Sequence, residues 1–426
     1  MKFNPLARSI SLGTFALALS IPMTAQAAFI EDSKASLEAR NFYMNRDFRS
    51  QGAAQSKAEE WGQGFLLRYE SGFTEGTVGV GVDAYGFLGL KLDSGGGRTG
   101  TQVLLPKDRK GNVPSSQGEL GAAAKFRISE SILRAGTLMP NLPVVAASDV
   151  RMLPQTFQGM QLTTQELDNL TLNLGQLERY NQRDSTNNEP MGILLHDGGK
   201  RDTSKYTKTN RDISNKFNFF SGSYNWNDEL TTGYHFGQLN GVYKQHIVNG
   251  VYTLPIADGQ SLRTDLRYAK TSEDNHSGID NKAISGMLTY KLGHNSFGLG
   301  YQKMSGDTGY AYLRFANAYL ANFVQVRDFA ATDEKSWQAR YDYNFAGLGM
   351  PGLNLMTRYI KGSNIYMGAN NSRGHEWERD TDISYVFQEG PLKNLGVKLR
   401  NATLRSDLSG KIDENRLIVS YTIPLM

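Results

Sequence analysis

Polar and apolar residues alternate strictly in many short segments of this chain. In the segment 417–423, apolar residues occupy the odd positions, while Arg416, Ser420 and Thr422 lie on the opposite face. The segment 337–345 repeats the pattern, with tryptophan, alanine, tyrosine and phenylalanine opposite polar residues. Comparable alternation recurs at 78–83, 170–175, 230–236 and 353–360. A period of two predicts β-strands with one apolar and one polar face.

The connections between these segments favour a barrel over a soluble sandwich. Short turns are predicted at 70–76 and 347–352, and long polar loops at 93–118, 180–213, 303–335 and 361–380. Short turns on one rim and long loops on the other are typical of a membrane β-barrel. The chain also ends on a strand, which would let the last strand pair with the first and leave no open edge.

Aromatic residues and chain length agree with this interpretation. Aromatic residues gather at the ends of apolar faces, as in the girdle of a membrane barrel: Tyr341, Tyr343, Phe345, Phe65 and Tyr69. About 22 residues for each strand with its connection gives roughly 16 to 18 strands, and a barrel of that size leaves an aqueous channel. The fold class is therefore all-β, a transmembrane antiparallel β-barrel.

The first 27 residues have the order of a secretory signal peptide. Lys2 and Arg8 give a positive start, residues 10–22 are mostly apolar, and residues 25–27 are typical of a cleavage site. The apolar run is too short to span a bilayer. We expect cleavage after Ala27, or alternatively after Ala28, and a single barrel domain over residues 28–426.

Composition excludes several classes of protein. The loss of Lys2 and Arg8 with the signal peptide lowers the formal net charge from +4 to +2, which does not indicate nucleic-acid binding. The chain has no cysteine, so disulfide scaffolds and thiolate metal sites are excluded, and no cofactor or metal is expected. No later stretch has the ~20 consecutive apolar residues of a membrane helix.

One predicted loop, residues 138–154, is apolar where the other loops are polar. A long apolar loop is unstable in water, so we expect it to fold into the lumen and narrow the channel. The alternative, an extra hydrophobic strand, is disfavoured because Pro140, Pro143 and Pro154 would interrupt strand pairing.

Basic residues occupy the polar faces of several predicted strands: Arg340, Arg358, Lys398, Arg400 and Arg416. A cation facing lipid at mid-depth costs ~2–4 kcal/mol, so these side chains are expected to point into the lumen. They could form a basic track that concentrates and guides carboxylates. The alternative is a generic solvated face with scattered pairs to Asp83, Asp265 and Asp342, and periodicity alone does not decide between the two.

The mature sequence resembles the OprD (Occ) family of outer-membrane channels of pseudomonads. The similar segments include Arg40–Asp47 (RNFYMNRD), Trp61–Phe65 (WGQGF), Tyr69–Thr74 (YESGFT), Gly81–Gly86 (GVDAYG) and Glu334–Asp342 (EKSWQARYD). Further similar segments are 88–92, 153–156, 301–303, 350–353 and 416–419. The resemblance covers essentially the whole mature chain in order.

This resemblance implies an 18-stranded barrel in the outer membrane, with inward-folded constriction loops and specificity for small carboxylates. It also implies a ladder of basic residues through the constriction, which matches Arg46, Arg151, Lys398, Arg400 and Arg416. The family balances this ladder with an acidic residue in a later loop, which matches Asp328. The expected partners are outer-membrane lipid and lipopolysaccharide, and the barrel-assembly machinery during biogenesis. The sequence leaves two oligomeric states open, a monomer and a weak homotrimer.

The sequence departs from the family pattern at two positions. Ala316 stands where channels for basic amino acids carry a second acidic residue, and Ser384 stands where a ladder lysine would be. The missing acid favours uptake of monocarboxylates, including aromatic or cyclic acids. A basic-amino-acid or peptide channel of the same family and a general diffusion porin remain the alternatives.

An enzyme is not expected. The histidines show no recognisable pairing with a serine in the sequence, as a hydrolase would require, and His235 is expected to be a solvated lumen residue. A long-chain fatty-acid transporter would need an N-terminal plug, whereas this mature chain enters a strand almost at once.

Overall fold

The computed structural model describes residues 29–426, apart from 102–103, 109 and 206–211. The predicted signal peptide, residues 1–27, and the alternative cleavage position at Ala28 lie outside the described residues. The signal peptide therefore stays a prediction.

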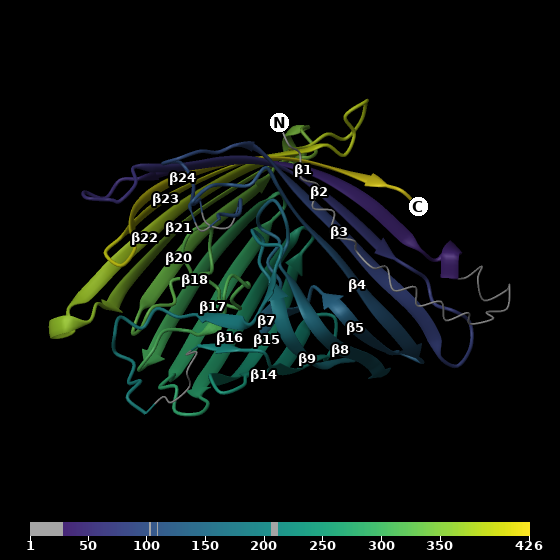
Figure 1. Cartoon of the computed structure of the whole chain (residues 1–426), viewed down its shortest axis with the longest axis horizontal. Helices are drawn as coiled ribbons and strands as arrows, with labels where there is room; N and C mark the ends of the chain where they lie inside the picture. Colours follow the sequence, from purple (N-terminus) through teal and green to yellow (C-terminus); the bar gives the residue numbers. More distant parts are fainter. Residues whose placement is uncertain (1–28, 102–103, 109, 206–211) are drawn as a thin grey trace, which may run out of the picture.

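Eighteen long antiparallel strands in the described part form one closed sheet (Figure 1). They are β1 (Lys34–Phe48), β2 (Lys57–Glu70), β3 (Gly79–Asp93), β4 (Ser116–Ile128), β5 (Ser131–Leu138), β8 (Thr156–Leu167), β9 (Leu170–Asn181), β13 (Phe217–Asn225), β14 (Leu230–Leu239), β15 (Tyr243–Ala257), β16 (Gln260–Glu273), β17 (Asn281–Leu292), β18 (Asn295–Gly306), β20 (Lys335–Asn344), β21 (Leu353–Tyr366), β22 (Arg373–Val386), β23 (Gly396–Ser406) and β24 (Gly410–Pro424). β1 pairs with β24, with Phe42 facing Ile418, so the barrel has no free edge. The predicted barrel and its approximate strand number are confirmed.

The two rims of the barrel differ as the pattern predicted. Residues 168–169, 258–259 and 293–294 form two-residue connections on one rim. The other rim carries the longest connections, 94–115, 139–155, 182–216 and 307–334. β1 starts and β24 ends at the short-turn rim.

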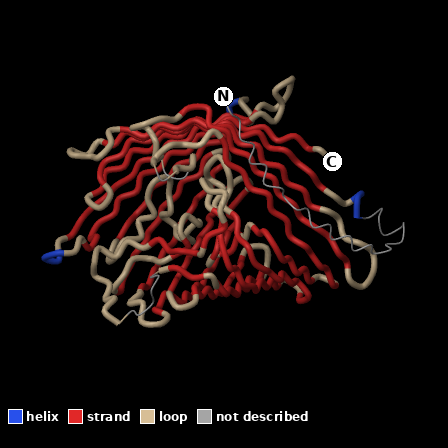
Figure 2. Tube along the Cα trace, viewed as in Figure 1, coloured by secondary structure: helices blue, strands red, loops and turns tan. Residues whose placement is uncertain are grey.

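Short elements within the long loops build a layer inside the barrel. β6 (Asn141–Leu142) pairs with β7 (Val145–Ala146), and β11 (Met191–Leu194) pairs with both β12 (Ile213–Ser214) and β19 (Tyr312–Leu313). β10 (Asn188–Glu189) pairs antiparallel with the end of β9 and belongs to the wall sheet. Figure 2 shows loop segments in tan gathered in the middle of the barrel, between the red strands of the wall. Beyond β1, helical structure in the described residues is limited to the short 3-10 turns η1 (Phe345–Leu348) and η2 (Ala369–Asn371). No helix in the described parts is long and apolar enough to cross a membrane.

The apolar loop lies inside the barrel, as expected. Met152 and Leu153 are buried against Phe42, Met44 and Leu66, which are lumen-facing residues of β1 and β2. Their burial removes the apolar side chains of the loop from water, which stabilises the inward position. The loop thereby occupies part of the lumen cross-section.

The prediction of a long loop at 361–380 is wrong. β21 continues to Tyr366 and β22 begins at Arg373, so only residues 367–372 connect them. Apart from Trp377, the first half of β22 is polar on both faces, with Glu376 and Glu378 toward the lumen and Arg379 on the outer face. Without polar and apolar alternation, the sequence of a strand resembles that of a loop.

Strands β4 and β5 form a tight hairpin in a region where the sequence shows no turn signal. The chain turns at Ser129, which has a φ of 49°, and the carboxylate of Glu166 accepts hydrogen bonds from the Ser129 hydroxyl and the Glu130 N–H. No glycine or proline marks this turn. Its stabilisation comes from the neighbouring strand β8, which the pattern did not predict.

Candidate functional site in the channel constriction

Three loops meet inside the barrel and bound a cavity of about 450 Å³. They are the segments 139–155, 182–216 and 307–334. The N–H of Asn317 donates to the carbonyl of Ala146 (2.9 Å), and the side-chain amide of Gln155 donates to the carbonyl of Arg314 (3.0 Å). Pairing of β11 with β19 joins the loop 182–216 to the loop 307–334. These bonds hold the loops as one constriction.

The cavity collects most of the predicted site residues. Arg151 comes from the first loop, Asp328 from the last, and Arg358, Arg400 and Arg416 from the wall strands β21, β23 and β24. Ala316 also lines it. Loops and wall therefore place basic and acidic groups around a single passage.

Arg46 and Arg416 share one carboxylate. Their guanidinium groups each lie 2.5 Å from Glu414, and all three side chains are buried. Arg416 also donates to the carbonyl of Gln325 (3.1 Å). Arg416 lines the cavity and Arg46 does not, so Arg46 supports the site from the wall of β1.

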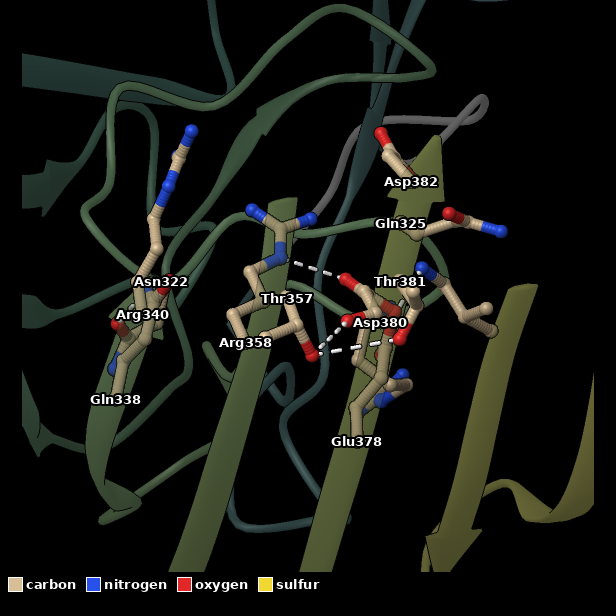
Figure 3. A network of polar contacts seen from close by, with 12 residues as sticks. Asn322, Gln325, Gln338, Arg340, Thr357, Arg358, Glu378, Asp380, Thr381 and Asp382 are labelled. Carbon is tan, nitrogen blue, oxygen red and sulfur yellow. Dashed lines mark hydrogen bonds and ion pairs between the residues drawn. The ribbon is translucent and has the colours of Figure 1, made fainter. Parts of the chain in front are cut away.

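The other ladder residues pair with carboxylates on neighbouring strands. Arg400 lies 2.9 Å and Lys398 3.5 Å from Asp382, and Arg358 lies 2.7 Å from Asp380. Figure 3 shows Arg358 of β21 reaching across to Asp380 of β22. These pairs fix the orientation of the cations, and they partly offset the positive charge.

A second cavity, of about 560 Å³, lies closer to the short-turn rim. It is lined by Lys398 and Arg340 and also by Ser384, the position where the family pattern has a lysine. Arg340 forms a 2.7 Å ion pair with Asp342. For this residue, the alternative of a solvated lumen face with scattered ion pairs therefore agrees with the structure. The basic residues thus extend from the constriction toward this rim.

Asp328 is buried and already has partners within the protein. Its Oδ2 accepts a 3.0 Å hydrogen bond from the Tyr312 hydroxyl and lies 3.6 Å from Nε2 of His196. Burial by itself would raise the pKa of Asp328, but the adjacent His196 and Arg327 hold that pKa below its ordinary value. Burial lowers the pKa of His196. Asp328 is therefore a fixed negative charge at neutral pH.

Arg183 is a cavity residue that the sequence did not reveal. Its Nη1 donates to the Ser148 hydroxyl (3.0 Å), and its guanidinium lies 5.6 Å from the ring centre of Phe315. Burial lowers the pKa of Arg183 to about 10, which still leaves it charged at neutral pH. Its loop has no alternating pattern, so only the tertiary fold identifies it.

Acidic residues of the wall hold the loop 307–334 in place. Glu378 accepts hydrogen bonds from the N–H groups of Val326 (2.8 Å) and Arg327 (2.9 Å). Glu376 forms a 3.0 Å ion pair with the Arg327 side chain. Both glutamates lie in the region that the sequence suggested to be a loop, which is why their role was not predicted.

The prediction that His235 is a solvated lumen residue is wrong. It is buried, and its Nδ1 lies 2.7 Å from the Ser221 hydroxyl, while its Nε2 lies 2.8 Å from Oδ1 of Asn249. Ser221 lies directly opposite His235, and Asn249 lies diagonally across from His235, opposite Gly233. They do not line the constriction cavity. A pairing across strands leaves no local motif, so the sequence could not show it.

The chain matches known proteins over nearly its whole length. The family model described as outer membrane porin, OprD family, matches residues 27–425. The porin-like protein GalP of Pseudomonas putida is 39% identical, covering 97% of each chain. The crystal structure of Pseudomonas aeruginosa OpdQ is 56% identical with a TM-score of 0.84, covering 94% of this chain and 100% of that chain. A BenF-like porin from Pseudomonas fluorescens Pf-5 is 41% identical with a TM-score of 0.87, covering 93% and 100%.

These matches agree with the closed 18-stranded barrel and its loop-lined constriction. The family consists of outer-membrane channels and not of enzymes. The chain therefore belongs to the OprD family of outer-membrane porins.

Proposed function

We propose that this porin takes up small carboxylates selectively, with monocarboxylates, including aromatic and cyclic acids, as its main substrates. The supporting observation is the charge of the constriction cavity. Among the described residues that line it are six arginines (Arg151, Arg183, Arg327, Arg358, Arg400 and Arg416), against a single carboxylate, Asp328.

Such a lining suits a carboxylate for two reasons. Cations in a narrow passage with low-dielectric walls raise the local concentration of anions. Guanidinium groups also present paired donors that match the two oxygens of a carboxylate. The wall carboxylates, such as Asp382 behind Arg400, keep the arginines oriented while leaving them at the cavity surface.

The lining offers little to a cationic substrate. Asp328 already accepts the Tyr312 hydrogen bond, and Ala316 adds only a methyl group where a second acid would stand. An entering ammonium or guanidinium group would lose hydration without gaining two fixed partners. This argues against the basic-amino-acid channel.

Apolar side chains share the same cavity. Tyr312, Phe315 and Phe323 line it beside Leu194 and Val324. A passage with apolar walls and a few convergent charged groups suits a ring that bears one carboxylate. This supports aromatic and cyclic acids within the proposed class.

Uptake into proteoliposomes containing the purified mature porin tests the proposal. Benzoate, arginine and a neutral sugar of similar size are compared under identical gradients. We expect benzoate to enter fastest and its uptake to saturate. Faster arginine uptake would favour the basic-amino-acid channel, and equal, non-saturating rates would favour a general diffusion porin.

A further inference from the structure

Five lysines form a row on the outer surface of the barrel, one on each of five neighbouring strands. In strand order β16, β17, β18, β20 and β21, they are Lys270, Lys282, Lys303, Lys335 and Lys361. All five are exposed, and each alternates with buried residues that face the lumen, such as Thr271 beside Lys270 and Gln302 beside Lys303. The row therefore faces the lipid side of the wall.

The position of the row relative to the membrane follows from its neighbours. Two residues further toward the short-turn rim, the outward positions hold Tyr268, Ile284, Tyr301, Trp337 and Tyr359. Trp337 packs on Tyr359, with ring centres 5.6 Å apart. Aromatic girdles mark the boundary of the hydrocarbon layer in membrane barrels. The lysines lie beyond this boundary on the long-loop side, which is the extracellular side, at the level of lipid headgroups.

The lysines repel one another within the sheet. Lys270 pairs directly with Lys282 across two strands, and Lys303 pairs directly with Lys335. Like charges at directly opposed positions destabilise a sheet. In the described part of the chain, no carboxylate lies within ion-pair distance of these five side chains, whereas Lys244 on β15 has Asp274 at 3.2 Å. The row lacks counter-charges of its own.

A different arc of the wall carries uncharged polar residues at its outward positions. On β9, β13 and β14 a set of directly paired outward positions holds Gln176, Asn218 and Gln238. The amide of Gln176 donates to Asn218 at 2.6 Å. The amide of Gln238 donates to Asp274 at 3.0 Å. Because these polar side chains have partners and the five lysines lack counter-charges, the lysine row indicates a local binding surface.

We propose that the lysine row binds the phosphate groups of lipopolysaccharide in the outer leaflet. Lipid A presents phosphates directly above its acyl chains, which is the level of the lysine row above the aromatic girdle. Lysine ammonium groups are point charges that bind phosphate well, and clustered lysines at a membrane surface attract anionic lipids. The site would anchor one arc of the barrel to lipopolysaccharide, and it is independent of the solutes that pass through the lumen.

Binding of lipid A to the detergent-solubilised mature porin tests the site. The test variant carries Lys282→Gln, Lys303→Gln and Lys335→Gln, and the control carries Lys34→Gln, Lys110→Gln and Lys393→Gln, three exposed lysines outside the row. Affinity for bisphosphorylated lipid A is expected to fall at least about tenfold in the test variant, because each surface lysine contributes to anionic lipid binding. The control variant is expected to keep the parent affinity.

Two further lipids test whether binding depends on the phosphates of lipid A or on any anionic lipid surface. Dephosphorylated lipid A is expected to bind the parent weakly, and phosphatidylglycerol vesicles are expected to compete poorly. Unchanged lipid A affinity in the triple variant, or equal affinity for phosphatidylglycerol, would overturn the proposal. The single variant Lys303→Gln, expected to show a smaller loss, serves if the triple variant does not fold. Benzoate uptake should be the same in the parent and in both triple variants.

Discussion

The hydroxyl group of Tyr312 donates a 3.0 Å hydrogen bond to Oδ2 of Asp328, the one carboxylate among the described residues of the constriction cavity. This bond occupies one oxygen of the carboxylate, and His196 lies beside the same atom at 3.6 Å. Among its described residues, the constriction cavity therefore offers a substrate one carboxylate, which already accepts a hydrogen bond, and six arginine side chains. Selectivity should respond strongly to any added acid.

The variant Ala316→Asp is expected to shift selectivity toward basic amino acids. A second carboxylate would give a substrate cation a partner in the cavity. It would also repel anionic substrates and so weaken their attraction to the basic ladder. The ratio of arginine to benzoate uptake should rise by about tenfold, as expected for one charged hydrogen bond. Ala316→Asn is the matched uncharged control. An equal shift in the asparagine variant would show that side-chain size, and not charge, sets the ratio.

The variant Arg400→Ala is expected to slow benzoate uptake by about tenfold or more, because a charged hydrogen bond contributes ~1.5–3 kcal/mol. Lys398→Ala should act in the same direction. Arg379→Ala, which removes an arginine from the outer face of β22, is the control and should transport like the parent. All three variants should keep the heat-modifiable gel mobility of a folded barrel. If Arg400→Ala and Lys398→Ala transport normally, the ladder assignment is wrong.

Anion preference should increase at acidic pH. Burial holds the pKa of His196 below its ordinary value of 6.5, so this histidine is neutral at pH 7 and gains its charge only as the pH falls below 6.5. Asp328, whose pKa is held below 3.8, stays ionised in that window. Reversal potentials of single channels in planar bilayers under a salt gradient measure the change between pH 7 and pH 5. His196→Gln should remove most of it, and cation preference at pH 7 would contradict the basic track.

The variant Glu378→Ala is expected to loosen the constriction loop. Its carboxylate accepts the N–H groups of Val326 and Arg327, and two unsatisfied buried donors cost ~1–3 kcal/mol each. Limited proteolysis should cut residues 307–334 faster, and single-channel currents should become noisier. Glu389→Ala, in the turn between β22 and β23, should leave both measurements unchanged. Identical proteolysis of the Glu378→Ala variant and the parent would show that other contacts hold the loop.

Export should remove the N-terminal segment. Because residues 1–27 have the charge, apolar run and small residues of a signal peptide, the mature protein is expected to begin at Ala28, or at Phe29 for the alternative cleavage. The intact mass of the protein purified from outer membranes decides between these positions. A mass that includes Met1 would exclude cleavage.

Several features of this porin follow from the sequence alone. Alternation in segments such as 417–423 and 337–345 predicted the strands, and the side chains of Arg358, Arg400 and Arg416 were placed in the lumen by parity. Such features depend on neighbouring residues along one strand, because successive side chains of a strand point to opposite faces. The apolar character of residues 138–154 likewise required burial, and the lumen was the available place.

Tertiary structure decided which of these residues act together. Arg183, the loop contacts of Glu378 and the pairing of Ser221 with His235 join residues from different loops or strands, and none leaves a local pattern. The first half of β22 was not predicted, because Glu376 and Glu378 on its lumen face bind the folded loop 307–334. Register between strands and packing between loops are set by the whole closed sheet. The sequence therefore determined the barrel and its inward cations, and only the closed fold assembled them into one constriction.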